Sequence, residues 1–205
     1  MPLFFFPADL FVEVRKEIAV GRRQAFVGSA SNTATMPEDL RTIDAAAREM
    51  YVRWNDPHAI ADAVRALSGV EALRAVVASH TAPPIMLLMN LWLTEVDVGR
   101  VVFEGEPGEE HYNPIGMVHG GFALTILDSA LGCAVHSTLP AGVGYATTDV
   151  QTRFIRGLSR QTGRVRCEAT TVHVGRTTGI AEARLTDSAG KLLATGTTAC
   201  AIFRP

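Results

Sequence analysis

The sequence predicts an α+β fold in which an antiparallel sheet wraps around one long buried helix. Two observations lead to this prediction. Apolar residues recur at helical spacing before about residue 82, whereas the later segments alternate apolar and polar residues with period 2. A single long apolar stretch, residues 113–135, stands among those later segments. We therefore predict a helical N-terminal extension over residues 1–82 and a domain of sheet and helix over residues 83–205.

Two capped helices are expected in the extension. Thr35 is a candidate N-cap with Glu38 three residues later, and residues 35–54 continue at helical spacing. A second helix is expected within residues 55–80, with Asp56 as its cap and Pro57 at its first position. The apolar stripes of the two helices are expected to dock on the second domain; they comprise Leu40, Ile43, Ala47 and Met50, and Ile60, Val64, Leu67, Leu73, Val76 and Val77.

The strands of the second domain follow the Pro83-Pro84 pair. Residues 85–106 are rich in β-branched and aromatic residues and predict two strands. Four further alternating segments after residue 143 predict an antiparallel meander, with a hairpin turn at residues 188–191. In one of these segments the apolar and charged residues strictly alternate, as in a sheet with one wet face: Val165, Cys167 and Ala169 against Arg164, Arg166 and Glu168.

The composition limits the partners. The net charge is -2, with 19 basic and 21 acidic residues mixed along the chain, which argues against a nucleic acid or an anionic membrane as partner. Three widely spaced cysteines are typical of reduced core residues, so we predict a cytoplasmic protein. No apolar run is long enough to span a membrane, and no histidine spacing is typical of a metal site, so no metal is expected.

The long apolar helix carries one acid, Asp128. An ionised carboxylate in an apolar interior costs several kcal/mol unless it is paired or hydrogen-bonded. The helix is expected to be buried nearly all round, and its small and polar residues form one narrow stripe: Gly121, Thr125, Asp128, Gly132 and His136. Such a stripe fits either a thin ligand or a twin helix, with Asp128 capping a loop amide in the second case.

Two glycines, Gly120 and Gly121, precede the apolar part of this helix. The first N–H groups of a helix have no partner within it and carry partial positive charge. They suit a carbonyl oxygen that must become an oxyanion, and glycine permits its close approach. A tight turn into the helix would explain the same two residues.

Together these residues resemble a known family. The stretch HYNPIGMVHGGFALTILDSA is similar to the asparagine, His-Gly-Gly and acid-on-helix motif of the PaaI-like hotdog-fold acyl-CoA thioesterases. Asn113 lies six residues before His119, and Asp128 lies eight after Gly120, as in the family. The resemblance covers roughly residues 84–204. The helical first 80 residues depart from it, because typical members begin close to the first strand.

The resemblance implies a hotdog fold, a homodimer or a dimer of dimers, and active sites shared between subunits. Asp128 would be the catalytic carboxylate, as general base or nucleophile. The Gly120 N–H would polarise the thioester carbonyl, Asn113 would assist it, Thr147 would orient water, and His119 would brace the loop. Coenzyme A would enter as part of the substrate and no separate cofactor is expected. Its candidate contacts are Gly121, Arg153, Arg156 and Arg176, although arginines at strand ends are also common on ordinary surfaces.

Three alternatives to an acyl-CoA thioesterase stay open. A hotdog hydratase or dehydratase would use a histidine together with the acid. A non-catalytic acyl-CoA-binding regulator would use the N-terminal helices on DNA, and the near balance of charge in those residues disfavours this. A purely structural dimer leaves the buried acid unexplained. The chain has no Gly-x-Ser-x-Gly motif, so Ser129 is interpreted as a small helix residue and not as a nucleophile.

Overall fold

The computed structural model describes residues 48–204, and residues 49–205 form one compact unit. The first predicted helix lies mostly outside the described residues, together with Thr35, Glu38, Leu40, Ile43 and Ala47. Its described end, residues 48–54, is not helical, and Met50 is exposed. The prediction of a helix reaching residue 54 is therefore wrong at its end, where the apolar side chains of Met50, Tyr51 and Trp54 are exposed and no tertiary packing stabilises a helix.

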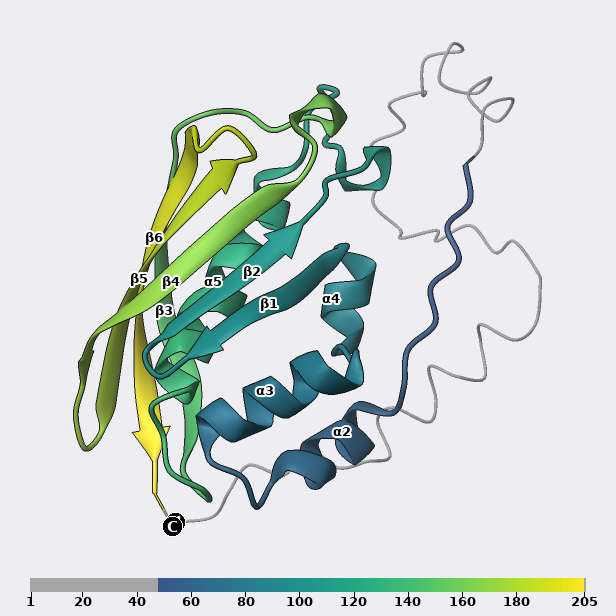
Figure 1. Ribbon diagram of the computed structural model, residues 1–205. Helices are drawn as coiled ribbons and strands as arrows, with labels where there is room; N and C mark the ends of the chain where they lie inside the picture. Colours follow the sequence, from purple (N-terminus) through teal and green to yellow (C-terminus); the bar gives the residue numbers. More distant parts are fainter. Residues whose placement is uncertain (1–47, 205) are drawn as a thin grey trace, which may run out of the picture. The chain divides into compact units, whose positions relative to one another are not determined.

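Six antiparallel strands form one sheet in the order β1-β2-β4-β5-β6-β3 (Figure 1). All six predicted strands are present: β1 (Leu91–Asp97), β2 (Arg100–Gly105), β3 (Gly144–Phe154), β4 (Val165–Val174), β5 (Thr178–Asp187) and β6 (Leu192–Phe203). The predicted four-strand meander is confirmed only for β4, β5 and β6. Strand β3 pairs with β6 instead, because the helix before it crosses the sheet and returns the chain at the far edge.

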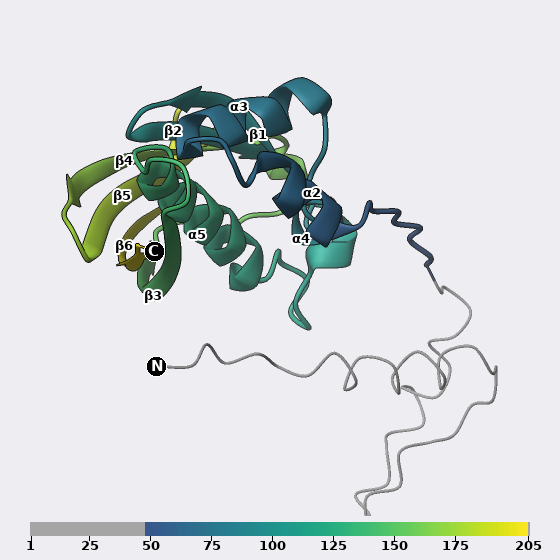
Figure 2. The same cartoon turned by 90° about the horizontal axis from the view of Figure 1, so that it is seen from below.

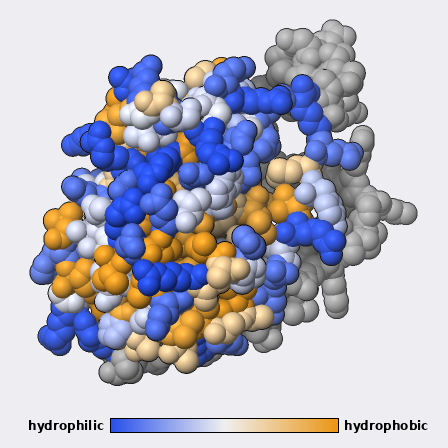
Figure 3. Space-filling model, viewed as in Figure 1, coloured by the Kyte–Doolittle hydropathy of each residue, from blue (hydrophilic) through white to orange (hydrophobic). Residues whose placement is uncertain are grey.

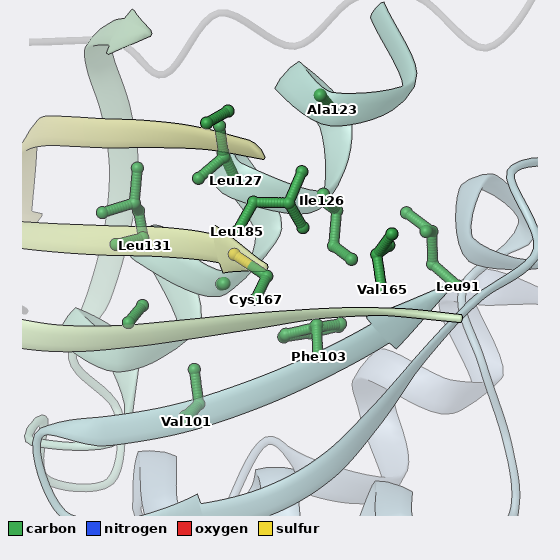
Figure 4. Packing of buried hydrophobic residues seen from close by; sticks show 14 of the residues in the cluster. Leu91, Val101, Phe103, Ala123, Ile126, Leu127, Leu131, Val165, Cys167 and Leu185 are labelled. Carbon is green, nitrogen blue, oxygen red and sulfur yellow. The ribbon is translucent and has the colours of Figure 1, made fainter. Parts of the chain in front are cut away.

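The predicted long helix is α5 (Gly120–His136), and it lies in the concave side of the curved sheet (Figure 2). Its inward side chains meet those of the strands in the core (Figure 4), where Phe122, Ile126, Leu127 and Leu131 are fully buried. The alternation predicted for β4 is also confirmed. Its apolar residues are buried against α5, and on the other face Arg166 donates a hydrogen bond to Glu95 at 2.9 Å.

The segment of residues 55–80 forms two helices, α2 (Pro57–Val64) and α3 (Gly69–Ser79), so the prediction of one helix is wrong. Asp56 caps α2 as predicted, and its carboxylate accepts a hydrogen bond from the His58 N–H at 2.9 Å. The helix is interrupted where a second capping box begins, since the Ser68 N–H donates to the Glu71 carboxylate at 2.9 Å.

A further helix, α4 (Pro84–Leu88), occupies the start of the segment that was predicted to be a strand. Proline at the first position of a helix loses no hydrogen bond, so Pro84 starts α4 and strand β1 begins only at Leu91. Helices α3 and α4 both pack against β1. The apolar stripe of the second predicted helix therefore splits, because Leu73, Val76 and Val77 of α3 face the domain while Leu67 is exposed.

Gly69 fixes the start of α3 on the end of α5. Its N–H donates to the Leu139 carbonyl at 2.9 Å, and a Cβ on Gly69 would overlap the His136 carbonyl oxygen. We expect Gly69→Ala to lower the free energy of unfolding by about 2 to 3 kcal/mol, in the range of overpacked sites. Thermal unfolding followed by circular dichroism should show a melting temperature lower by roughly 5 to 10 °C.

The matched control is Gly144→Ala, where the added Cβ would meet no atom within 4 Å. It should leave the melting temperature within about 1 °C of the native value, as substitutions at open sites do. Equal melting temperatures for the two variants would show that α3 is not held by this close approach.

Candidate active site

The loop before α5 is built to hold the start of that helix. The Asn113 carboxamide oxygen accepts the N–H groups of Ile115 and Met117, both at 3.1 Å, which closes the loop on itself. The His119 N–H donates to the His111 carbonyl at 2.7 Å. Asn113 therefore shapes the loop through its oxygen, and only its NH₂ group is left for a ligand.

His119 is the N-cap of α5. Its Nδ1 accepts the Gly121 N–H at 2.8 Å, and its carbonyl accepts the Phe122 N–H at 3.0 Å. Histidine is not among the usual capping residues, so neither propensity nor spacing indicates this contact. The Gly121 N–H is thus already used within the protein.

The Gly120 N–H has no acceptor within residues 48–204. Gly120 is the first residue of α5, so this donor points out of the helix start with the positive end of the helix dipole behind it. The Phe154 ring lies beside it, with Cζ 3.2 Å from the place of a Cβ on Gly120. This pair offers one free N–H next to an apolar surface.

Asp128 lies two turns further along α5 and is half-buried. The Thr147 hydroxyl, on strand β3, donates to its carboxylate at 3.0 Å. One hydrogen bond leaves most of the acceptor capacity of an ionised carboxylate open. The acid and the hydroxyl that the sequence analysis singled out are therefore brought together, and a water molecule can reach the remaining lone pairs.

The helix is not buried all round as predicted, because its outward face is open in the described chain. Leu124 is 40% exposed, and Thr125, Asp128 and Ser129 are half-buried. The sheet covers only the inner side of α5, and β3 and β1 are its two edges. The open face follows the predicted stripe of small and polar residues from Gly121 to Asp128, whereas Gly132 further along is buried.

The acid and the free amide of one chain cannot act on the same carbonyl. Eight residues separate Gly120 from Asp128, and at 1.5 Å per residue they lie about 12 Å apart along the helix axis. An oxyanion must lie about 3 Å from its donor, and the attacking water must touch the same carbon. A site that uses both groups therefore needs a second copy of the helix.

Tyr145 covers the far end of the stripe. Its ring lies over Gly132, where a Cβ would be 3.0 Å from Cε2, and it meets the His136 ring edge-on at 5.2 Å. Burial raises the pKa of Tyr145 well above its ordinary value and lowers the pKa of His136. No local sequence pattern indicates this tyrosine, because only the fold brings β3 beside this turn of α5.

Cys133, on α5, lies beside Tyr145 of strand β3. Burial, with a smaller contribution from the Asp128 carboxylate, raises the pKa of its thiol to about 12, although a hydrogen bond with Tyr145 acts in the opposite direction. A thiol with this pKa is almost wholly protonated at neutral pH, and the thiolate is the nucleophilic form. Cys133 therefore does not compete with Asp128 for attack on a carbonyl.

The three candidate arginines differ in their surroundings. The Arg156 guanidinium donates to the Leu192 carbonyl, so it holds the end of β3 against β6. The Arg153 side chain is exposed on β3, opposite Thr195 in the register. Arg176 is exposed in the β4–β5 turn, and its carbonyl accepts from the Arg204 side chain at 3.1 Å. Within the described chain none of the three contacts Asp128.

Residues 48–204 contain neither a candidate metal cluster nor a candidate membrane-spanning helix. Three or more His, Cys, Asp or Glu side chains do not converge anywhere in this part of the chain as a metal site would require. No helix between residues 48 and 204 has the length and apolar character needed to cross a membrane.

The sequence is similar to known thioester hydrolases. Residues 115–194 match the thioesterase superfamily. The 1,4-dihydroxy-2-naphthoyl-CoA hydrolase of Listeria monocytogenes is 26% identical over 113 residues, which cover 51% of this chain and 84% of that protein. A Halobacterium salinarum protein named as an esterase is 41% identical over 78 residues, which cover 37% of this chain and 46% of that protein.

Solved structures share the fold. The PaaI protein of the E. coli phenylacetic acid degradation operon matches with a TM-score of 0.58 at 17% identity, covering 67% of this chain and 96% of that one. A Streptococcus mutans protein bound to acetyl-CoA matches with a TM-score of 0.51 at 23% identity, covering 57% of this chain and 92% of that one. The predicted hotdog fold and the resemblance to PaaI-like thioesterases are confirmed.

Proposed function

We propose that this chain, whose residues 115–194 match the thioesterase superfamily, hydrolyses acyl-coenzyme A thioesters to a carboxylic acid and free coenzyme A. The proposal rests mainly on the surroundings of Asp128. Its carboxylate is half-buried on an open helix face and accepts a hydrogen bond from the Thr147 hydroxyl at 3.0 Å. A thioester carbonyl is already electrophilic. A carboxylate and an N–H at the developing oxyanion are therefore sufficient equipment for its hydrolysis.

In the proposed reaction Asp128 takes a proton from water, and the hydroxide oxygen bonds to the thioester carbon. The carbonyl electrons move to oxygen, where the Gly120 N–H of a second subunit stabilises the negative charge. The carbon–sulfur bond then breaks, and the thiolate of coenzyme A takes up the proton. Alternatively, the Asp128 carboxylate attacks the thioester carbon directly and expels the thiolate of coenzyme A. Water then hydrolyses the resulting anhydride, which regenerates Asp128 and releases the carboxylic acid. Both routes need Asp128 ionised.

A homodimer would complete this site. Strand β3 pairs on one side only within the described chain, so its outer edge offers free N–H and C=O groups to a second copy. Exposed apolar side chains gather on β3, α5 and the loop before it; they are Ile115, Met117, Leu124, Phe154 and Ile155. Edge pairing would cover them, and a dimer of dimers is compatible with the same geometry.

Coenzyme A carries phosphates, for which Arg153 and Arg176 are the better candidates because both side chains are exposed. Arg156 is the weaker one, since its guanidinium already binds the Leu192 carbonyl. The Streptococcus mutans protein of the same fold was found bound to acetyl-CoA. The three cysteines of the chain are unpaired, which agrees with our proposal that the enzyme works in the cytoplasm.

A thiol-release assay over a panel of acyl-CoA thioesters tests the proposed function. We expect at least one thioester to be hydrolysed with kcat/KM of about 10⁴ M⁻¹s⁻¹ or more, as is usual for a natural substrate. Saturable binding of acyl-CoA without thiol release would instead indicate a regulator. Addition of water to an enoyl-CoA, seen as loss of its ultraviolet absorbance without thiol release, would indicate a hydratase.

A further inference from the structure

A second feature of the described chain is an apolar pocket of about 600 Å³ between α3, α4 and strand β1. Its wall is mainly aliphatic and aromatic, with Val76 and Val77 from α3, Met86 from α4, and Leu93 and Phe103 from the sheet. Figure 3 shows apolar side chains gathered on this face of the molecule, over the region of α4 and β1. The volume is typical of small-molecule sites.

Three of the polar side chains in this wall are satisfied by the protein, and a fourth, that of His80, is exposed to solvent. Asn90 donates to the Glu106 carbonyl at 2.9 Å, and Thr94 donates to the Val102 carbonyl at 3.2 Å. The Thr81 hydroxyl is paired with that of Ser79 at 2.8 Å. A ligand in the pocket would therefore gain little from polar contacts, and an apolar group fits it best.

The pocket meets α5, the helix that carries Asp128, at one residue. Cys133 belongs to the pocket wall, and its thiol is near enough to Asp128 for the carboxylate to act on its pKa. Ser129 lies between them on the open face, one turn before Cys133. The Ser129 hydroxyl donates back to the Thr125 carbonyl at 2.7 Å, and that of Thr125 to the Gly121 carbonyl at 2.8 Å. The surface between acid and pocket thus presents no free hydroxyl donor to an acyl chain.

We propose that this pocket, which we call the acyl pocket, holds the acyl group of the substrate, and that the enzyme prefers large apolar acyl groups over acetyl. The inference rests on the proposed function and adds the substrate class to it. With the thioester carbon at Asp128, the acyl chain crosses Ser129, passes Cys133 and enters the space between α3 and β1. Helices α3 and α4 are then specificity elements of the site.

Filling the acyl pocket tests the inference. In the full chain, Val77→Phe adds a ring inside the pocket, and Val76→Phe is a second filling variant in case the first does not fold. Because one extra group in an apolar pocket changes kcat/KM by about tenfold or more, we expect the decanoyl-CoA value to fall by at least that factor. The acetyl-CoA value should stay within about twofold, since acetyl does not reach the pocket.

The matched control is Ala78→Phe, because Ala78 is exposed on the same helix and does not line the pocket. This variant should leave kcat/KM for both decanoyl-CoA and acetyl-CoA unchanged. An unchanged ratio of decanoyl-CoA to acetyl-CoA activity in a folded filling variant would overturn the acyl pocket and leave the proposed hydrolysis intact.

Calorimetric titration with decanoic acid separates the two proposals. If the native chain hydrolyses no acyl-CoA but binds decanoic acid, and Val77→Phe abolishes that binding while Ala78→Phe does not, the acyl pocket stands and the proposed hydrolysis falls. If the filled and native chains bind decanoic acid equally, the acyl pocket is refuted whatever the hydrolysis assay shows.

Discussion

Asp128→Asn is expected to lower kcat for acyl-CoA hydrolysis by about a hundredfold or more, the usual loss when a general base is removed. The amide has nearly the shape of the carboxylate and can still accept the Thr147 hydroxyl, which now lies 3.0 Å from the acid. It can neither take a proton from water nor attack the thioester. The Michaelis constant should change little, because the lost interaction belongs to the transition state. Steady-state kinetics with thiol detection measures both constants.

Asp62→Asn is the matched control for this experiment. Asp62 is exposed on α2 and pairs there with Arg65, so its amide should leave kcat within about twofold of the native value. Thermal unfolding of Asp128→Asn shows whether the variant is folded. Near-native hydrolysis by folded Asp128→Asn would refute the catalytic role of the acid.

The central helix and the strands were the parts most readily predicted from the sequence. Gly120 and Gly121 followed by an apolar run predict the start of α5, and the observed helix begins at Gly120. Period-2 alternation predicts the last four strands, because a strand with one buried face must alternate, and richness in β-branched and aromatic residues predicts the first two. The order of the strands was not predictable in the same way. The position of β3 beside β6 depends on where α5 crosses the sheet, which no local pattern records.

The errors in the helical part have local causes. A Ser-x-x-Glu pattern at residues 68–71 is a capping box and could have indicated the break between α2 and α3. The short apolar run of α4 satisfies the patterns of both helix and strand, and only Pro84 distinguishes them.

The candidate site was predictable in its residues but not in its contacts. The isolation of Asp128 in an apolar helix and the resemblance around it selected the acid, the resemblance also pointed to Thr147, and the structure adds the hydrogen bond between them. The cap by His119 and the ring of Tyr145 over Gly132 came only from the structure. Neither contact has a characteristic pattern in the local sequence, so neither could be predicted from it.

Gly120→Pro is expected to lower kcat by about a hundredfold to a thousandfold, the usual loss when an oxyanion donor is removed. Proline deletes the free N–H, and the first position of a helix tolerates it. His119 before it already has φ -61° and ψ 139°, which suits a residue that precedes proline. Gly120→Ala is the matched control, because it keeps the N–H and adds only a methyl group beside the end of the Phe154 ring. Equal kcat values for the two variants would exclude the amide from catalysis.

Mixing Gly120→Pro with Asp128→Asn should restore activity, because the two groups lie about 12 Å apart on one helix and a site needs both. In a mixed dimer the Gly120→Pro chain supplies Asp128 and the Asp128→Asn chain supplies the amide, so one of the two sites is native. Random exchange of equal amounts makes half of the dimers mixed, which predicts about a quarter of native activity in a closed two-fold dimer. The measurement is thiol release after the chains have been unfolded and refolded together. If two inactive variants stay inactive after demonstrated exchange, the acid and the amide do not come from different subunits.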